Sequence, residues 1–221
     1  EAFGDRPYQG RGGPIPIYRA PREKWGAVDL ALDKAAGDLG YGHCADHNAP
    51  SGTGASPYAI NCRNGIRVST NDGYLEGARE RANLTIVGDA MVDRVEFEGS
   101  RAVALHVRIG AASHRIEAGE IILSAGAIHS PAILMRSGIG PASLLRALDI
   151  PVRVDAPVGE NLREHPLLAV QLELKPAARA GGLDRRHTNC CVRYSSGLES
   201  SAVNDMILIA FNLLGASSDH L

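Results

Sequence analysis

Residues 120–131, EIILSAGAIHSP, decide the fold class. The first four are an apolar run typical of a short strand that is buried on both faces. Three small residues follow at 124–126, where the chain must turn and another group must come close. Ser130 is a good N-cap and Pro131 suits the first helical position, so a helix is expected over 132–136. Strand, small-residue turn and helix predict an α/β fold and the local geometry of nucleotide sites, although many such units bind no ligand.

Four further elements are expected before this stretch. Apolar residues that share one face predict a helix over 22–37. Ser69 followed by Asp72 at three-residue spacing predicts the start of a second helix, which continues to about residue 82. A short strand at 84–87 then precedes a hairpin whose strands, 91–98 and 102–109, flank a Gly-Ser turn. His106 falls on the polar face of the second hairpin strand, where it is expected to be solvated.

The segments after this stretch predict a second, β-rich unit. Gly138 is expected to cap the preceding helix in the left-handed conformation, and a short helix should follow it. Beyond residue 151 the β-prone runs are 167–174, 190–194 and 206–214, and the new unit is expected to begin near residue 163. Residues 41–65 form a long loop rich in Gly, Pro, Asn and Ser, of the kind that is functional or closely packed.

The composition excludes several classes of protein. The chain has 221 residues, 44% of them hydrophobic and 22% charged, so a disordered chain, a collagen and a coiled coil are all excluded. The formal net charge of −2 provides no basic field for nucleic acid or anionic lipid. The longest strongly apolar run, 206–214, is far shorter than the ~20 residues that cross a bilayer. Neither nucleic acid nor a membrane-spanning segment is therefore expected.

The amino terminus and the cysteines carry weaker signals. Residues 1–4 have neither the basic start nor the apolar region of a signal peptide, and no initiator Met is present. The chain is therefore expected to begin inside a longer protein and to be cytoplasmic. The four cysteines show no C-x-x-C spacing, so reduced and mostly buried thiols are expected. His43 and His47 flank a cysteine and an aspartate, but too few ligands gather there for a closed site, and no metal is expected.

At 126–140, GAIHSPAILMRSGIG, the sequence resembles the second signature of the glucose–methanol–choline (GMC) oxidoreductases, flavoenzymes that oxidise alcohols. The match runs from about residue 12 to 170. Segments that agree in order and spacing are Gly13-Pro14-Ile15-Pro16-Ile17, Asp46-His47-Asn48 with Gly52-Thr53-Gly54, Gly65-Ile66-Arg67-Val68-Ser69, and Val158-Gly159-Glu160-Asn161-Leu162-Arg163-Glu164-His165, where Glu replaces the family's Asp.

This resemblance implies an incomplete fold of the α/β class, α+β overall, with FAD as cofactor. Residues 12–21 and 62–162 would form part of a Rossmann-like FAD-binding domain. Residues 22–61 and 163–221 would form part of a β-rich substrate-binding domain. Only half of the FAD site is expected in this chain.

The departures from the family pattern concern the catalytic machinery. The G-x-G-x-x-G fingerprint that seats the pyrophosphate is not in this sequence, nor is the region that carries the catalytic His and its His or Asn partner. None of the eight histidines matches that base: His129 falls on a variable position of the signature, and His165 suits a packing or capping role. No catalytic residue is therefore expected, and the 221 residues alone are expected to be inactive.

Four residues match positions that contact the cofactor in the family. The resemblance implies that the backbone of Val92 meets the adenine edge, although an ordinary strand valine is the alternative. It also implies that Ser124, Ala125 and Gly126 form the small turn against which the adenosine half of FAD packs. Tight packing between strand and helix would explain the same small residues.

The function that the resemblance implies is oxidation of an alcohol by hydride transfer to flavin, as an oxidase or a dehydrogenase. The expected partner is a small-molecule alcohol, and self-association through exposed strand edges is also expected. Two alternatives stay open. One is a catalytically silent stand-alone or degraded module, and the other is a relative that splits cyanohydrins, an FAD-containing hydroxynitrile lyase.

Overall fold

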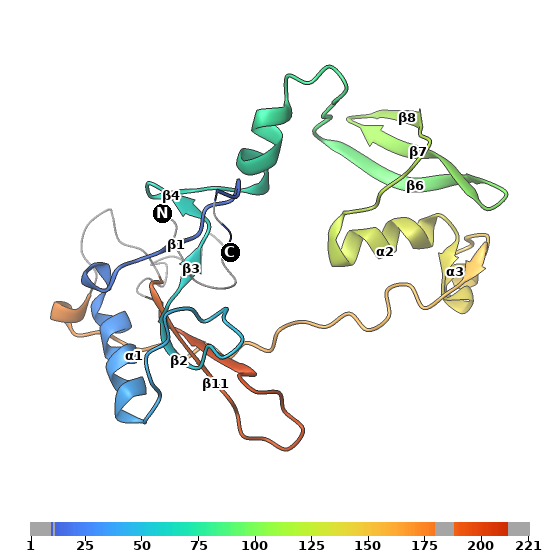
Figure 1. Ribbon diagram of the computed structural model, residues 1–221. Helices are drawn as coiled ribbons and strands as arrows, with labels where there is room; N and C mark the ends of the chain where they lie inside the picture. Colours follow the sequence, from blue (N-terminus) through green and yellow to red (C-terminus); the bar gives the residue numbers. More distant parts are fainter. Residues whose placement is uncertain (1–9, 11, 180–187, 212–221) are drawn as a thin grey trace. The chain divides into compact units, whose positions relative to one another are not determined.

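The computed structural model describes residues 10, 12–179 and 188–211, which form two compact units of mixed helix and strand (Figure 1). Unit 1 combines Glu1–Leu84 with Val170–Leu221, and unit 2 is Thr85–Ala169. The expected mixed α and β fold class is confirmed. Within the described ranges, no helix is long and apolar enough to cross a membrane.

Unit 1 is built on a three-stranded antiparallel sheet in the order β12-β11-β2. The strands are β2 (Gly54–Pro57), β11 (Cys190–Tyr194) and β12 (Met206–Ile209), and helix α1 (Ala27–Asp38) covers β11 and β2. The expected strand at 190–194 is thus confirmed. The smaller elements are β1 (Tyr18–Arg19) paired with β3 (Ala59–Ile60), β4 (Cys62–Arg63) paired with β5 (Ile66–Arg67), and the single turns η1 (Arg22–Lys24), η2 (Asn71–Leu75), η3 (Glu76–Ala78) and η4 (Pro176–Ala178).

The helix predicted over 22–37 is broken near its start. A 3-10 turn, η1, is followed by Trp25 and Gly26 in extended conformation, and α1 begins only at Ala27. The break has a packing reason, because the Trp25 ring is buried and its Nε1 donates to the Ala20 carbonyl at 2.9 Å. Trp25 and Ala20 then form one small core with Cys190.

The cysteines of unit 1 are free thiols, and three of the four are buried. Burial raises the pKa of Cys190 to about 12, with its neighbour Cys191 contributing, and burial raises the pKa of Cys191 to about 12 as well. Both thiols therefore stay protonated near neutral pH, which makes them packing residues rather than nucleophiles.

The long loop predicted at 41–65 is closely packed and contains the short strands β2 to β4. The helix predicted at 69–82 was only partly right. The Ser69–Asp72 box forms, since the Asp72 carboxylate accepts from the Ser69 N–H at 2.7 Å and from its hydroxyl at 2.6 Å. The chain then makes one π turn, η2, and one 3-10 turn, η3, and the segment 84–87 forms no strand because no neighbouring strand pairs with it.

Unit 2 consists of a three-stranded antiparallel sheet, β6-β7-β8, covered by α2 (Gly126–Arg136) along β6 (Figure 1). The hairpin of β6 (Ala90–Glu98) and β7 (Arg101–Ile109) confirms the expected one. The third strand, β8 (Ala112–Glu117), was not foreseen, because all six of its residues are exposed and carry no apolar alternation. The unit ends with β9 (Ile139–Gly140), α3 (Ala142–Ala147) and β10 (Val154–Asp155), which pairs in parallel with β9.

Two expectations for the deciding stretch are wrong. The segment 120–123 is not a strand, and Ile122 is 79% exposed, because no strand in the described part of the chain pairs with it. Helix α2 also begins at Gly126, so Pro131 lies inside it and Ser130 is not its N-cap. The left-handed cap at Gly138 is confirmed by its φ of +86°.

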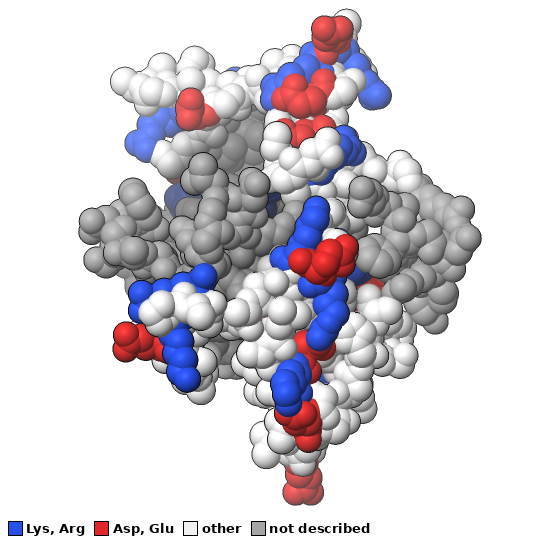
Figure 2. Space-filling model, turned by 90° about the vertical axis from the view of Figure 1, so that its left-hand side faces the viewer, with Lys and Arg blue, Asp and Glu red and all other residues white. Residues whose placement is uncertain are grey.

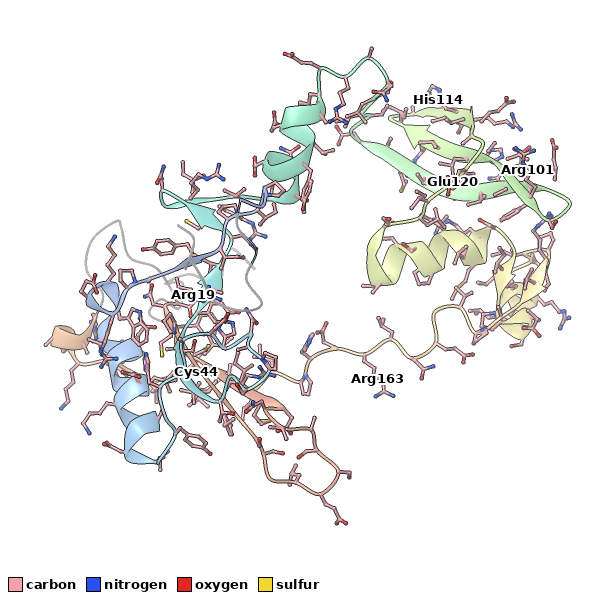
Figure 3. All side chains as sticks on the ribbon, viewed as in Figure 1. Arg19, Cys44, Arg101, His114, Glu120 and Arg163 are labelled. Carbon is pink, nitrogen blue, oxygen red and sulfur yellow. The ribbon has the colours of Figure 1, made fainter. Side chains whose placement is uncertain are left out.

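The run at 167–174 is likewise not a strand. Residues 162–173 are exposed and belong to no helix or strand, and Arg163 projects from this stretch (Figure 3). A segment with alternating apolar residues forms a strand only if a neighbouring strand hydrogen-bonds to its backbone. None of the described strands pairs with residues 167–174.

Candidate functional site

The expected cofactor turn, Ser124 to Gly126, is the link into α2. All three residues are exposed. Gly126 has a φ of +84°, in the left-handed region that favours glycine, and a Cβ built there would meet nothing within 4 Å. The Ala125 N–H donates to the Ser130 hydroxyl at 2.9 Å, which fixes the turn from inside the helix. Ser130 therefore supports the turn instead of capping a later helix.

This turn leaves an open approach to the first turn of α2. The first N–H groups of a helix have no intrahelical partner and carry partial positive charge, so they attract polar or anionic groups. The small side chains of Ser124 and Ala125 and the empty space beside Gly126 leave room for a bulky ligand. The residues present therefore fit an adenosine-type group packed on the turn.

The other end of α2 is fastened to β6, the strand that carries Val92. The Arg136 side chain donates to the Asp93 carbonyl at 2.7 Å and to the Val92 carbonyl at 3.4 Å. The register with β7 shifts between Val92 and Arg94, so the strand is irregular there. Within the described residues no hydrogen bond joins Val92 to Ser124–Gly126, and α2 is the element that packs on β6 and begins at this turn.

Two hollows in the described part of the chain do not include these four residues. One hollow, of about 410 Å³, is lined by Arg22, Asp33, Gly37, Tyr41, Gly42 and His43. The other, of about 240 Å³, is lined by Pro141, Asp155, Ala156, Pro157 and Glu160. The three residues of the expected cofactor turn are exposed, so the turn is an open surface in this chain.

The two histidines weighed as metal ligands have different partners. His43 Nδ1 lies 3.3 Å from an Asp33 carboxylate oxygen, whereas the His47 ring is stacked on Tyr58. Among the described residues, no group of three or more His, Cys, Asp or Glu side chains could hold a metal ion. His129 and His165 are exposed.

His106 corrects a further expectation, because it is half-buried and paired rather than solvated. Its Nε2 lies 2.8 Å from Glu96 Oε2, and Arg115 binds both oxygens of the same carboxylate, at 2.9 and 3.1 Å. The hydrogen bonds from Arg115 lower the pKa of Glu96, with His106 adding to the effect. The cluster joins β6, β7 and β8. Glu96 lies 10 positions from His106 and 19 from Arg115, and the cluster was missed because β8, the strand that carries Arg115, was not predicted.

Charged side chains of opposite sign also lie next to one another on the face shown in Figure 2. Ion pairs such as Lys34 with Asp38 and Arg79 with Glu76 are of this kind, with partners three or four positions apart on one turn. Exposed pairs of this type contribute little to stability.

A family model described as GMC oxidoreductase matches residues 7–167. Among curated proteins, 5-(hydroxymethyl)furfural oxidase of Methylovorus sp. (strain MP688) is 37% identical over 212 residues, covering 93% of this chain and 40% of that protein. Oxygen-dependent choline dehydrogenase of Pseudomonas fluorescens (strain SBW25) is 43% identical over 174 residues, covering 76% of this chain and 30% of that protein.

Among solved structures, pyridoxine 4-oxidase from Mesorbium loti superposes with a TM-score of 0.64 at 38% sequence identity. That similarity covers 67% of this chain and 29% of the oxidase. The chain thus spans no more than about two fifths of the length of these three relatives.

Proposed function

Because the chain belongs to the GMC oxidoreductase family, we propose that it is the middle segment of an enzyme that oxidises the CH–OH group of a small-molecule alcohol. The observation that carries the proposal is the family match over residues 7–167, which includes the turn and helix at 124–136. The relatives named above are an oxidase of 5-(hydroxymethyl)furfural, a dehydrogenase of choline and an oxidase of pyridoxine, which supports an alcohol as the class of substrate.

FAD is the cofactor of this family, as the sequence led us to expect. FAD would supply the acceptor for the hydride that leaves the carbon bearing the hydroxyl group. The role proposed for this chain is binding. Ser124, Ala125 and Gly126 would seat the adenosine half, the first N–H groups of α2 would face its polar atoms, and the backbone of Val92 would meet the adenine edge.

Two further parts of the proposal concern organisation. We assign residues 12–21 and 62–162 to the FAD-binding domain of the enzyme, and residues 22–61 and 163–221 to its substrate-binding domain. These boundaries differ from those of the two compact units, Glu1–Leu84 with Val170–Leu221 and Thr85–Ala169. We also assign no catalytic residue to the chain, since none of its histidines occupies the position of the family's base. The 221 residues alone are therefore proposed to be inactive toward alcohols.

The proposal is tested by filling the space over the turn without straining the backbone. Ala125 has a φ of −85°, whereas Gly126 lies in the left-handed region, so a side chain at 125 changes only the available space. We expect Ala125→Leu in the complete enzyme to weaken FAD binding at least tenfold, measured by flavin fluorescence on titration of the apoprotein. The melting temperature of the apoprotein should not change.

The matched control is Ala147→Leu, which adds the same side chain at an exposed position of α3. That variant should bind FAD as the unmodified enzyme does. Unchanged FAD affinity in Ala125→Leu would contradict the cofactor role of the turn. A lowered melting temperature of the apoprotein would instead favour the alternative that the small residues serve strand–helix packing.

A further inference from the structure

A loop in unit 1, residues 46–53, is held by polar side chains from distant parts of the chain. Arg19 of β1 forms an ion pair with Asp46 at 2.7 Å, and both side chains are largely buried. Arg193 of β11 donates to the carbonyls of His47 at 2.7 Å and Ala49 at 3.3 Å. At the end of the loop, the Thr53 hydroxyl donates to the Asn204 side chain at 2.8 Å.

The backbone of this loop is folded tightly on itself. A Cβ added to Gly52 would lie 2.6 Å from the Asp46 carbonyl oxygen and 3.0 Å from the His47 carbonyl oxygen. The main chain at Gly52 therefore packs directly against the main chain at Asp46 and His47, which leaves no room for a side chain at position 52.

His47 lies at the centre of these contacts. It is only 8% exposed, and its ring stacks on Tyr58 with centroids 5.3 Å apart and an interplanar angle of 4°. Its main-chain N–H donates to the Ser56 hydroxyl at 3.1 Å. Nδ1 is buried and has no hydrogen-bond partner in the described structure, so a proton on Nδ1 would have no acceptor there.

Burial is the largest influence on the pKa of His47, and the neighbouring groups act in both directions. Burial lowers the pKa of His47, and the guanidinium groups of Arg19 and Arg193 lower it further, while a hydrogen bond to the Pro57 carbonyl and the carboxylate of Asp46 act in the opposite direction. The net direction is downward from the ordinary value. The neutral imidazole is thus the form that is favoured when the 46–53 loop is packed as the structure shows it.

We propose that His47 is an acid-sensitive latch: when its imidazole takes up a proton, the 46–53 loop leaves its place against β2 and β11. The imidazole binds a proton more readily when the loop is open than when it is packed against β2 and β11. The free energy that favours the packed loop is therefore fully present above the ordinary histidine pKa of about 6.5, and it is lost progressively as the pH falls below that value. The latch depends on contacts within unit 1 and not on flavin binding.

Hydrogen exchange of the amides at 46–53, measured on the full chain at pH 7.5 and pH 5.0 and corrected for intrinsic rates, tests the latch. We expect their protection to fall about twofold or more at pH 5.0, while amides of the β6–β7 hairpin in unit 2 keep theirs. His47→Phe retains an aromatic ring against Tyr58 without a titratable group, so its loop should stay protected at both pH values. His165→Phe, at an exposed position, should respond to pH as the unmodified chain does.

Equal loss of protection at pH 5.0 in His47→Phe and in the unmodified chain would overturn the proposal. If the phenylalanine variant does not fold, NMR titration of the His47 ring protons in the unmodified chain decides the question. A midpoint below about 6.5 supports the latch, and a midpoint at or above that value overturns it.

Discussion

Asp29 shows how much of unit 1 depends on one buried side chain. Its carboxylate is completely buried. One oxygen accepts from the main-chain N–H groups of Asn189 and Cys190 at 3.1 and 3.0 Å, and the other accepts from the Gly26 N–H at 3.0 Å and the Asn189 side chain at 2.9 Å. The start of α1 is thereby joined to the start of β11, about 160 positions further along the chain.

Replacing this carboxylate tests its role at the residue scale. In Asp29→Asn an amide NH₂ faces N–H donors and the negative charge is gone, so we expect a loss of about 2–4 kcal/mol in the stability of unit 1. Trp25, the single tryptophan of the chain, is buried in this unit, and its fluorescence during urea unfolding reports the change. Asp38→Asn on the exposed end of α1 is the control and should change stability by less than about 0.5 kcal/mol. Similar unfolding midpoints for the two variants would show that the buried carboxylate is dispensable.

At the scale of elements, the joint between α2 and β6 depends on Ser137. This residue is buried, its hydroxyl oxygen accepts from the Val95 N–H at 2.8 Å, and its hydroxyl donates to the Ile133 carbonyl at 2.6 Å. The joint sets the position of α2 on the sheet, and α2 begins at the turn proposed to hold the cofactor.

Ser137→Ala should leave the Val95 N–H buried without a partner, at a cost of about 1–3 kcal/mol. We expect the Val95 amide to exchange at least tenfold faster in native-state hydrogen exchange. Ser143→Ala, at an exposed position of α3, should leave that rate unchanged. Full protection of Val95 in the Ser137 variant would mean that another group holds the strand to the helix.

At the scale of the whole molecule, the described part of the chain exposes a large apolar surface. Strand β12 lies at the edge of its sheet, and its residues Met206, Ile207 and Leu208 are 41–50% exposed. Leu167, Leu168, Val170 and Leu172 are exposed to a still greater extent. An open, apolar strand edge is a template for pairing with another chain.

We therefore expect the purified chain to associate. Its apparent mass in gel filtration should exceed the 23.3 kDa of one chain and should rise with protein concentration. Leu208→Glu, which adds charge to the edge strand, should shift the equilibrium toward the monomer. Leu198→Glu, exposed on a turn, should not. A sharp monomeric peak for the unmodified chain, with no binding of a hydrophobic dye, would show that these surfaces do not drive association.

The predictions that the structure confirms are those that depend on residues close together in the sequence. The β6–β7 hairpin, the left-handed cap at Gly138 and the strand at 190–194 depend on turn residues and on patterns within a few positions, and all three are present. The strands expected at 120–123 and 167–174 are not, because a strand needs a partner that its own residues do not specify. The four cofactor residues, Val92 and Ser124–Gly126, stay predictions.

The sequence by itself determined the family, the cofactor class and the mixed fold, because a signature such as residues 126–140 is a continuous run whose residue types and spacing can be read without the structure. Only the tertiary structure decided which polar groups are buried together. Asp29 meets Cys190, and His47 meets Arg193, across 161 and 146 positions of the chain. Such pairs form because an unpaired buried polar group is costly, so most of these groups bond to whichever partner the fold brings close. That requirement leaves no periodic pattern in the sequence, and the acid-sensitive latch proposed at His47 depends on contacts of this kind.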